Sequence, residues 1–170
     1  MITQVSVIGP GSDLCTPDLY EFAHSLGRIL ADRELVIICG GRGGVMEAIC
    51  AGAKESARYK KFTTIGILPG LERNDANSYC DVVIPTGLNL ARNQLVINSG
   101  DVIIALGGGA GTLSELAFAW QFGKKVICYI TEPGWASKLA GKSIDSRHED
   151  LLIPVDSLEG IVNQLAQLML

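Results

Sequence analysis

The sequence has few of the residues from which many catalytic and metal sites are built. It contains only two histidines, His24 and His148, and neither lies near a serine or cysteine in a nucleophile motif. Triads based on histidine are therefore not expected, and both histidines are predicted to lie at the surface. The five cysteines form an odd count with no C-x-x-C pair. We expect reduced thiols that pack as small apolar side chains, and neither a disulfide framework nor a zinc site.

Long apolar runs and basic runs are also missing. No apolar stretch approaches the ~20 residues that span a bilayer, and the first nine residues lack the basic start and long apolar middle of a signal peptide. The net charge of −4, without a basic run, argues against a general nucleic-acid binder. We expect a cytoplasmic protein with no membrane or nucleic-acid partner. The 170 residues, 48% of them apolar, suffice for a single domain over residues 1–170.

Short apolar, β-branched runs alternate with segments of helical periodicity along the chain. Such runs are typical of strands covered on both faces, as in a parallel sheet. The expected strands are Gln4–Gly9, Leu35–Cys39, Thr63–Leu68, Asp81–Ile84, Val102–Leu106, Val126–Ile130 and Leu151–Val155. The expected helices cover residues 17–32, 44–57, 88–99, 112–122 and 157–169. This alternation predicts an α/β fold: a single Rossmann-like, doubly wound domain with a mainly parallel sheet of about seven strands.

Local signals mark several helix ends. Thr16 before Pro17 is typical of an N-cap with proline at the first helical position. Asp156 with Glu159 three residues later resembles a capping box. Two glycines stand where C-terminal glycines belong, Gly100 and Gly123. Two irregular stretches are long enough to be lids or dimer-contact loops, residues 69–79 and 131–149.

Glycine is the one residue type in excess. It supplies 20 of the 170 residues, against a usual share of about 7%. Ten of the glycines form three clusters, each directly after an expected strand: Gly9 and Gly11; Gly40, Gly41, Gly43 and Gly44; Gly107, Gly108, Gly109 and Gly111. Ligands bind at the carboxyl edge of an open α/β sheet, where glycine lets backbone N–H groups approach and a helix N-terminus attracts negative charge. The clusters predict a site for an anion, a phosphate above all.

The cluster in Gly107–Glu115 (GGGAGTLSE) is the strongest of these signals. The backbone N–H groups of residues 108–112, Ala110 included, are expected to cradle the anion, and the Thr112 hydroxyl to add a contact. The pattern T-x-x-E also fits a capping box, in which the Glu115 carboxylate folds back onto the Thr112 N–H. For Glu115 this capping role and a ligand-facing or catalytic role both stay open.

The other two clusters are expected to wall the same cleft. In Gly40–Glu47 (GGRGGVME), the segment Gly40–Gly44 forms the wall, and Arg42 either reaches the phosphate or stays solvated. Met46 is predicted to be a packing residue. Gly9–Ser12 (GPGS) is a common turn by itself, and only its place at the sheet edge makes it a candidate wall.

Arg92 is the remaining charged candidate. Helical spacing places it on one stripe with Leu88, Leu95 and Val96. A cation on an apolar stripe must reach solvent, pair with an acid or face a ligand. A salt bridge to Glu115 and a contact with an anionic ligand are both open, and they are compatible.

Three aromatic residues in the expected helix 112–122 suggest that this helix is covered on more than one side: Phe118, Trp120 and Phe122. Steps of two residues diverge by about 200° on a helix, so the three side chains cannot share one face. The cover is either a neighbouring subunit or the irregular segment around Trp135. We expect a homo-dimer or homo-tetramer that pairs through helices 88–99 and 112–122.

Several motifs occur in a specific order and spacing between residues 4 and 130. They are Gly40-Gly41, Gly44-Val45-Met46-Glu47, Thr64-Ile65-Gly66-Ile67-Leu68-Pro69-Gly70, Thr86-Gly87-Leu88, Ala91-Arg92-Asn93 and Gly108-x-x-Gly111-Thr112-x-x-Glu115. In these motifs the chain resembles the Rossmann-like LOG ("lonely guy") superfamily, long labelled as possible lysine decarboxylases. It looks closest to the molybdenum cofactor carrier branch, to which the short chain and the Thr-Gly-Leu, Ala-Arg-Asn and Gly-Val-Met segments correspond.

The carrier resemblance implies a protein that binds the molybdenum cofactor (molybdopterin) and stores it or hands it on. The loop at residues 107–112 would hold an anion of this cofactor, with Arg92 paired to it. Molybdoenzymes or cofactor-synthesis proteins would be the partners. No protein-ligated metal is expected, because the dithiolene of the cofactor itself holds molybdenum.

The LOG resemblance implies an alternative, a nucleoside 5′-monophosphate phosphoribohydrolase that cleaves the bond between base and ribose 5-phosphate. Its motif P-G-G-x-G-T-x-x-E and upstream arginine correspond to Glu115 and Arg92, which would be catalytic. The chain departs from that pattern at Gly107, which replaces a proline, and at Asn93-Gln94, where many hydrolases carry Arg-Lys. The carrier is therefore the main expectation, and enzymatic activity stays open. Lysine decarboxylation is excluded because no lysine for pyridoxal phosphate lies at the expected edge.

Overall fold

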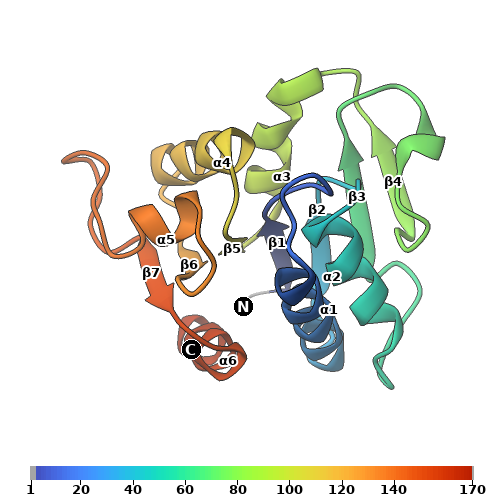
Figure 1. The fold of residues 1–170 in the computed structure, drawn as a ribbon, viewed down its shortest axis with the longest axis horizontal. Coiled ribbons are helices and arrows are strands. Elements are labelled where there is room, and N and C mark those ends of the chain that lie inside the picture. Colours follow the sequence, from blue (N-terminus) through green and yellow to red (C-terminus); the bar gives the residue numbers. More distant parts are fainter. Residues whose placement is uncertain (1–2, 170) are drawn as a thin grey trace.

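The computed structural model describes residues 3–169, which form a seven-stranded sheet between two layers of helices (Figure 1). The strands are β1 (Gln4–Ile8), β2 (Val36–Cys39), β3 (Thr64–Leu68), β4 (Val82–Pro85), β5 (Val102–Leu106), β6 (Val126–Tyr129) and β7 (Leu152–Val155). Their order is β4-β3-β2-β1-β5-β6-β7, and every neighbouring pair is parallel. All seven expected strands are confirmed, with ends that differ by at most one residue. The Rossmann-like α/β fold is therefore confirmed.

The helices cover both faces of the sheet. One layer holds α1 (Pro17–Asp32), α2 (Val45–Lys54) and α6 (Leu158–Leu168), and the other holds α3 (Asn93–Ser99), α4 (Ala110–Gln121) and α5 (Trp135–Leu139). Two 3₁₀ turns, η1 (Arg73–Asp75) and η2 (Asn89–Arg92), complete the elements. Within residues 3–169, none of the helices has both the length and the apolar character that a membrane crossing requires.

Each face of the sheet packs against its own helix layer. Val7 and Ile104 lie in the cluster with α1, α2 and α6, whereas Ile8 and Ile103 lie in the cluster with α3, α4 and α5. Neighbouring residues of a strand thus serve opposite faces, as the pleat requires. Because both faces are buried, the central strands are mostly apolar, with Ser6 of β1 as a buried polar exception, and this made them recognisable in the sequence.

The strands that follow β1 along the chain are added first on one side of β1 and then on the other. Strands β1 to β4 progress toward one edge, and the chain then returns to β5, which pairs with the other side of β1. A crevice forms at such a switch point, beyond the carboxyl ends of the two strands. The fold therefore places the first and third glycine clusters side by side, with the second next to them.

Two expected helix ends are confirmed and two are wrong. Thr16 caps α1, where its side chain accepts a 3.2 Å hydrogen bond from the Leu19 N–H, and Gly123 follows α4 with a left-handed φ of 66°. The expected capping box at Asp156 is wrong, because Ser157 is the N-cap of α6 and accepts from the Gly160 N–H. Gly100 does end α3, but its backbone is extended rather than left-handed.

The expected continuous helix over residues 88–99 is wrong. Asn89 has a positive φ of 49°, and the chain forms the 3₁₀ turn η2 before α3 begins at Asn93. The predicted apolar stripe is therefore also wrong. Of its three apolar members, Leu88 and Leu95 are 48% and 39% exposed, and only Val96 is buried. Two exposed leucines therefore lie on the surface where the contact between subunits is predicted.

The aromatic residues of α4 are covered in part by the segment after α5. Trp120 is buried, donates a 2.8 Å hydrogen bond from Nε1 to Asp145, and meets the edge of the His148 ring. The predicted cover by the irregular segment therefore exists for this side chain, and His148 is half-buried rather than a surface residue. Phe122 remains 39% exposed. Helix α5 itself was not predicted, because five residues give too short a pattern to separate from a loop.

Candidate functional site

The three glycine clusters meet at the carboxyl edge of β1, β2 and β5. The Val45 N–H, at the start of α2, donates to the Pro10 carbonyl at 3.1 Å, which ties the second loop to the first. Gly9 lies so close to Leu106 that an added Cβ would come within 2.9 Å of its carbonyl oxygen, which brings the first loop to the end of β5. The predicted convergence of the clusters is therefore present in the fold.

A cleft of about 130 Å³ opens at this edge. Its wall comes from the ends of strands, the loops and the starts of helices: Val7, Ile8, Gly9, Gly40, Met46, Leu90, Arg92, Asn93, Gly111, Thr112 and Glu115. Two further hollows are lined by residues of the same glycine loops. One of about 430 Å³ shares Met46 and includes Gly11, Arg42 and Gly43, and one of about 210 Å³ includes Gly108 and Gly109.

The predicted site residues divide between these hollows and the turns behind them. Six of them line the central cleft and five line its neighbours. Gly41, Gly44 and Gly107 instead form buried turns with positive φ angles of 75°, 70° and 57°. Their role is to shape the loops, which a side chain would strain. Ala110 lies exposed at the start of α4.

Arg92 ends η2, and its side chain points into the protein rather than into solvent. The residue is 8% exposed. Its guanidinium lies against the backbone of Gly40, where an added Cβ would come within 2.5 Å of Nη1 and 2.6 Å of Nη2. Glycine at position 40 is thus needed to leave room for the charged group, a requirement that the spacing of the sequence did not reveal.

The side chains of Arg92 and Glu115 face each other but do not form a hydrogen bond. The distance between Arg92 Nη1 and Glu115 Oε1 is 3.9 Å, which is within the range of an ion pair when the carboxyl group is ionised but too long for a hydrogen bond. Among the described residues, Arg92 Nε is a buried polar atom without a hydrogen-bond partner. An unpaired donor on a buried cation is costly. The guanidinium of Arg92 can therefore still donate hydrogen bonds to an acceptor, above all to an anion.

Burial shifts the titration of both members of this pair. It raises the pKa of Glu115 to about 8, although the positive charge of Arg92 opposes the shift. It also lowers the pKa of Arg92, although Glu115 opposes that shift. Glu115 is accordingly protonated for the most part at neutral pH, and Arg92 remains the charge that determines what the cleft attracts.

The start of α4 supplies backbone donors to the same cleft. The first bond at this end of the helix runs from the Leu113 N–H to the Gly109 carbonyl, and Gly109, the N-cap, has no side chain to cap it. The N–H groups of Ala110, Gly111 and Thr112 precede that bond, so they point out of the helix. An added Cβ at Gly111 would meet nothing within 4 Å, so a ligand has open access to this turn.

Of the two roles that the sequence left open for Glu115, the capping box with Thr112 does not form. The helix begins at Ala110, two residues before the expected start, so Thr112 lies inside the first turn rather than at the cap. Its hydroxyl points at the loop, where a Cβ on Gly108 would come within 2.1 Å of Oγ1. The carboxyl group of Glu115 therefore faces the cleft and Arg92, and does not turn back onto the backbone.

Both irregular stretches hold glycine loops in place. Asn77 donates from its backbone to the Gly41 carbonyl at 2.8 Å and from Nδ2 to the Arg42 carbonyl at 2.9 Å. At the third loop, the Trp135 N–H donates to the Gly108 carbonyl at 3.0 Å. The segments 69–79 and 131–149 thus hold the second and third glycine loops in place through hydrogen bonds to their carbonyl groups.

Arg42 is exposed at the rim, on the hollow that also contains Ser12 and Asp13. Its charge contributes to the lowered pKa of Arg92, so both cations act on the same region. Sequence reasoning did not place Asn93 at the site. This buried side chain lines the cleft and donates from Nδ2 to Ser114 Oγ at 3.0 Å. Its position directly after Arg92 in the Ala-Arg-Asn motif was the available signal.

Comparison with known proteins gives the same family as the motifs. The family model described as the SLOG cluster4 family matches residues 2–161. A molybdenum cofactor binding protein from Rippkaea orientalis is 32% identical, with a TM-score of 0.83 over 100% of this chain and 99% of that one. The molybdenum cofactor carrier protein of Chlamydomonas reinhardtii is 30% identical, with a TM-score of 0.83 over 98% of each chain.

A sequence relative carries the name of the alternative function. A cytokinin riboside 5′-monophosphate phosphoribohydrolase from Mycobacterium marinum is 29% identical over 167 residues, which are 88% of this chain and 87% of that protein. The resemblance to the LOG superfamily near the molybdenum cofactor carrier branch is thereby confirmed, while the two named functions remain distinct possibilities.

Proposed function

The chain belongs to the SLOG cluster4 family, and we propose that it is a carrier that binds the molybdenum cofactor through its terminal phosphate. The phosphate would lie between the guanidinium of Arg92 and the first turn of α4. One observation carries the proposal. A buried arginine, with an unpaired Nε and a partner 3.9 Å away, lines the same cleft as the start of α4.

The electrostatics of the cleft favour an anion. Glu115 is mostly protonated at neutral pH, because burial raises its pKa to about 8, so it does not neutralise Arg92. The partial positive charge of the α4 N-terminus adds to the charge of the arginine. Each hydrogen bond from these donors to a charged phosphate contributes about 1.5–3 kcal/mol. A neutral ligand would leave most of this capacity unused.

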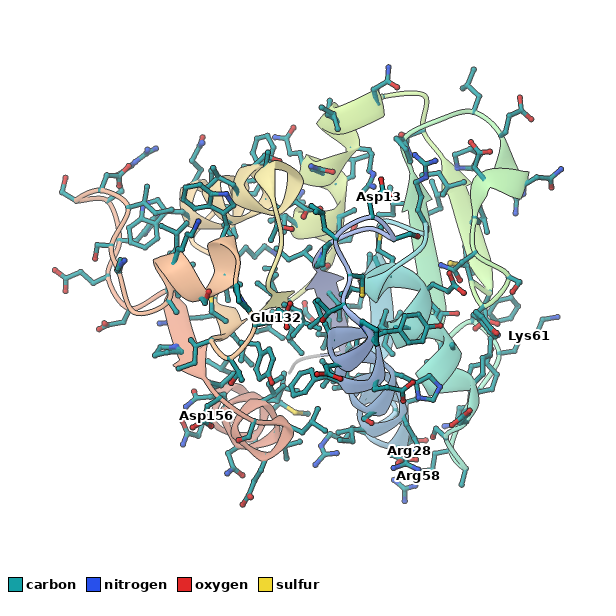
Figure 2. All side chains as sticks on the ribbon, in the orientation of Figure 1. Asp13, Arg28, Arg58, Lys61, Glu132 and Asp156 are labelled. Atoms are coloured by element: carbon teal, nitrogen blue, oxygen red, sulfur yellow. The ribbon has the colours of Figure 1, made fainter. Side chains whose placement is uncertain are left out.

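The neighbouring hollows give space for the rest of a cofactor-sized ligand. A volume of 130 Å³ beside Arg92 holds a phosphate, but it is below the roughly 300–1,000 Å³ of ordinary ligand pockets. The adjoining hollows have carboxylates in their walls, Asp13 on the loop after β1 and Glu132 on the loop after β6 (Figure 2). These groups accept hydrogen bonds from ring N–H, amino or hydroxyl groups, which a pterin carries in quantity.

A phosphoribohydrolase of the LOG type is the second candidate. It is supported by the relative from Mycobacterium marinum and by the pairing of Arg92 with Glu115. The state of Glu115 is compatible with both candidates. A carboxyl group with a pKa of about 8 is mostly protonated at neutral pH, and a protonated carboxyl group with a raised pKa serves as the general acid in glycosidic cleavage. The departures of this chain from the hydrolase motif at Gly107 and Asn93-Gln94 favour the carrier.

Two assays with the same variants test the proposal. In the first, the protein is incubated with AMP and related nucleotides, and free base is measured by chromatography. In the second, molybdenum cofactor released from a molybdoenzyme is exposed to air with and without the protein. The surviving cofactor is then measured by its ability to reactivate a cofactor-free enzyme. The variants are Glu115→Gln and Arg92→Ala, with Arg33→Ala, at the C-terminal end of α1, as a control.

The carrier predicts protection of the cofactor by the wild-type protein and by Arg33→Ala, reduced protection by Arg92→Ala, and no release of base. Release of base that Glu115→Gln abolishes would identify the hydrolase and contradict the proposal. Equal protection by the wild-type protein and Arg92→Ala would show that the cofactor, if bound, is not held at this cleft.

A further inference from the structure

Three of the five cysteines, for which the sequence predicted reduced thiols and no zinc site, lie together in the fold. The Sγ atoms of Cys39 and Cys50 are 3.7 Å apart, those of Cys50 and Cys80 are 3.9 Å apart, and all three lie within 4.8 Å of one another. Cys39 ends β2, Cys50 lies on α2, and Cys80 precedes β4. The sequence hides this cluster, because its members are 11 and 30 residues apart.

The cluster is closed on the inside and open on one side. Cys39 and Cys50 are fully buried, whereas Cys80 is only half-buried and gives access from solvent. The Gly41 N–H donates a 3.4 Å hydrogen bond to Cys39 Sγ, a contact that stabilises negative charge on the sulfur. Contacts among protonated thiols would hold the group together weakly, since S–H is a poor donor.

The spacing of the sulfur atoms matches that of thiolates around one metal ion. Metal–sulfur bonds of about 2.3 Å, as in zinc–thiolate sites, put sulfur atoms about 3.8 Å apart in tetrahedral geometry and about 4.0 Å apart in trigonal planar geometry. The two Sγ–Sγ distances in the structure, 3.7 and 3.9 Å, are close to these values without movement of the backbone. The third pair has to close by less than about 1 Å, since it lies within 4.8 Å.

The set of ligands is sulfur alone. Among the described residues, the group of potential ligand atoms contains only these three cysteines. Asp81, the carboxylate next in the chain, is already bonded to Lys54 and Tyr59. Thiolates select soft cations such as Cu(I) over the harder divalent ions, and structural Zn²⁺ requires a fourth ligand.

We propose that Cys39, Cys50 and Cys80 form a three-coordinate thiolate site for one soft cation, Cu(I). This site lies behind the second glycine loop, because Cys39 immediately precedes Gly40 and Gly41. It uses none of the residues assigned to the anion cleft. Its occupant would hold the end of β2, helix α2 and the turn before β4 together. This proposal does not depend on the function proposed above, and each can be contradicted without the other.

The test is an anaerobic titration of the reduced, full-length protein with Cu(I) in competition with a coloured Cu(I) chelator. The wild-type protein is expected to retain one Cu(I) per chain, and Cys80→Ser to lose it. Cys15→Ser is the matched control, since Cys15 is also half-buried but lies outside the cluster. It is expected to retain copper like the wild-type protein. Zn²⁺ in place of Cu(I) forms a second arm.

X-ray absorption at the copper edge keeps the test independent of whether the variant folds. The loaded wild-type protein is expected to show three sulfur neighbours at about 2.3 Å. The proposal is overturned if the chelator removes copper equally from the wild-type protein and Cys80→Ser, or if nitrogen or oxygen neighbours dominate. Retention of Zn²⁺ without Cu(I), or formation of a disulfide within the cluster in place of copper binding, would also overturn it.

Discussion

The unusual state of Glu115 leads to a prediction about stability. In the substitution Glu115→Gln the buried carboxyl group becomes an uncharged amide of nearly the same shape. Burial raises the pKa of Glu115 from 4.5 to about 8 in the folded protein. The folded state therefore holds a proton that the unfolded state has released between these two values. Stability is lost as the pH rises through this window, and the Glu115→Gln variant lacks that loss.

The size of the effect follows from the two pKa values. For one group with pKa values of 4.5 unfolded and about 8 folded, the linkage relation gives a loss of roughly 3–4 kcal/mol between about pH 5 and about pH 8. The attraction to Arg92 at 3.9 Å already opposes the shift and is included in that value. All other titrating groups are shared by the two proteins, so their difference isolates Glu115.

The assay is urea unfolding of both proteins at a series of pH values, with ligand absent. The free energy of unfolding of Glu115→Gln minus that of the wild-type protein should be small at about pH 5 and rise by about 3 kcal/mol toward about pH 8. A difference that does not vary with pH would show that Glu115 titrates like an ordinary carboxyl group. A difference that falls with pH would show that the ionised form is favoured, and either result would refute the reasoning.

Four further substitutions test the geometry. Gly40→Ala places a Cβ within 2.5 Å of the Arg92 guanidinium, so binding of AMP measured by calorimetry should weaken by about 1–3 kcal/mol; unchanged affinity would show that Arg92 does not hold the ligand from this position. Gly108→Ala has to adopt a φ of 94° against Thr112 and should lose about 1–3 kcal/mol of unfolding free energy. Gly111→Ala, with open space around it, should lose much less, and equal losses would contradict the assignment of strain. Leu90 is 79% exposed beside the cleft, so Leu90→Glu should reduce the expected dimer or tetramer to monomers in light scattering; a wild-type protein that is already monomeric at micromolar concentration would rule out the interface.

The strands were predictable because their physical signal is local. Both faces of the sheet are covered, so the central strands are mostly apolar runs such as Val102–Leu106, which is bounded by Asp101 and Gly107. The segments that failed depend on contacts far away in the chain. Asn89 adopts a left-handed conformation, which a pattern of apolar residues does not predict. Helix α5 is held in place by hydrogen bonds to the carbonyl groups of Gly107 and Gly108.

The site was predictable in its position but not in its electrostatics. Glycine clusters directly after strands indicate a sheet edge where a ligand can approach the backbone, and the structure brings all three clusters together. The spacing T-x-x-E did not tell a capping box from a cleft residue, because the answer depends on where α4 begins. Nor did the sequence show that Gly40 makes room for Arg92, or that three cysteines converge beneath the second loop.

The anion cleft is tested most directly by a crystal structure of the protein soaked with AMP, a phosphate-bearing ligand small enough to enter. We expect a phosphate within hydrogen-bond distance of the Arg92 guanidinium and of the backbone N–H groups at the start of α4. A phosphate bound elsewhere, or a cleft that stays empty while Arg92 closes onto Glu115 at saturating ligand, would contradict this expectation.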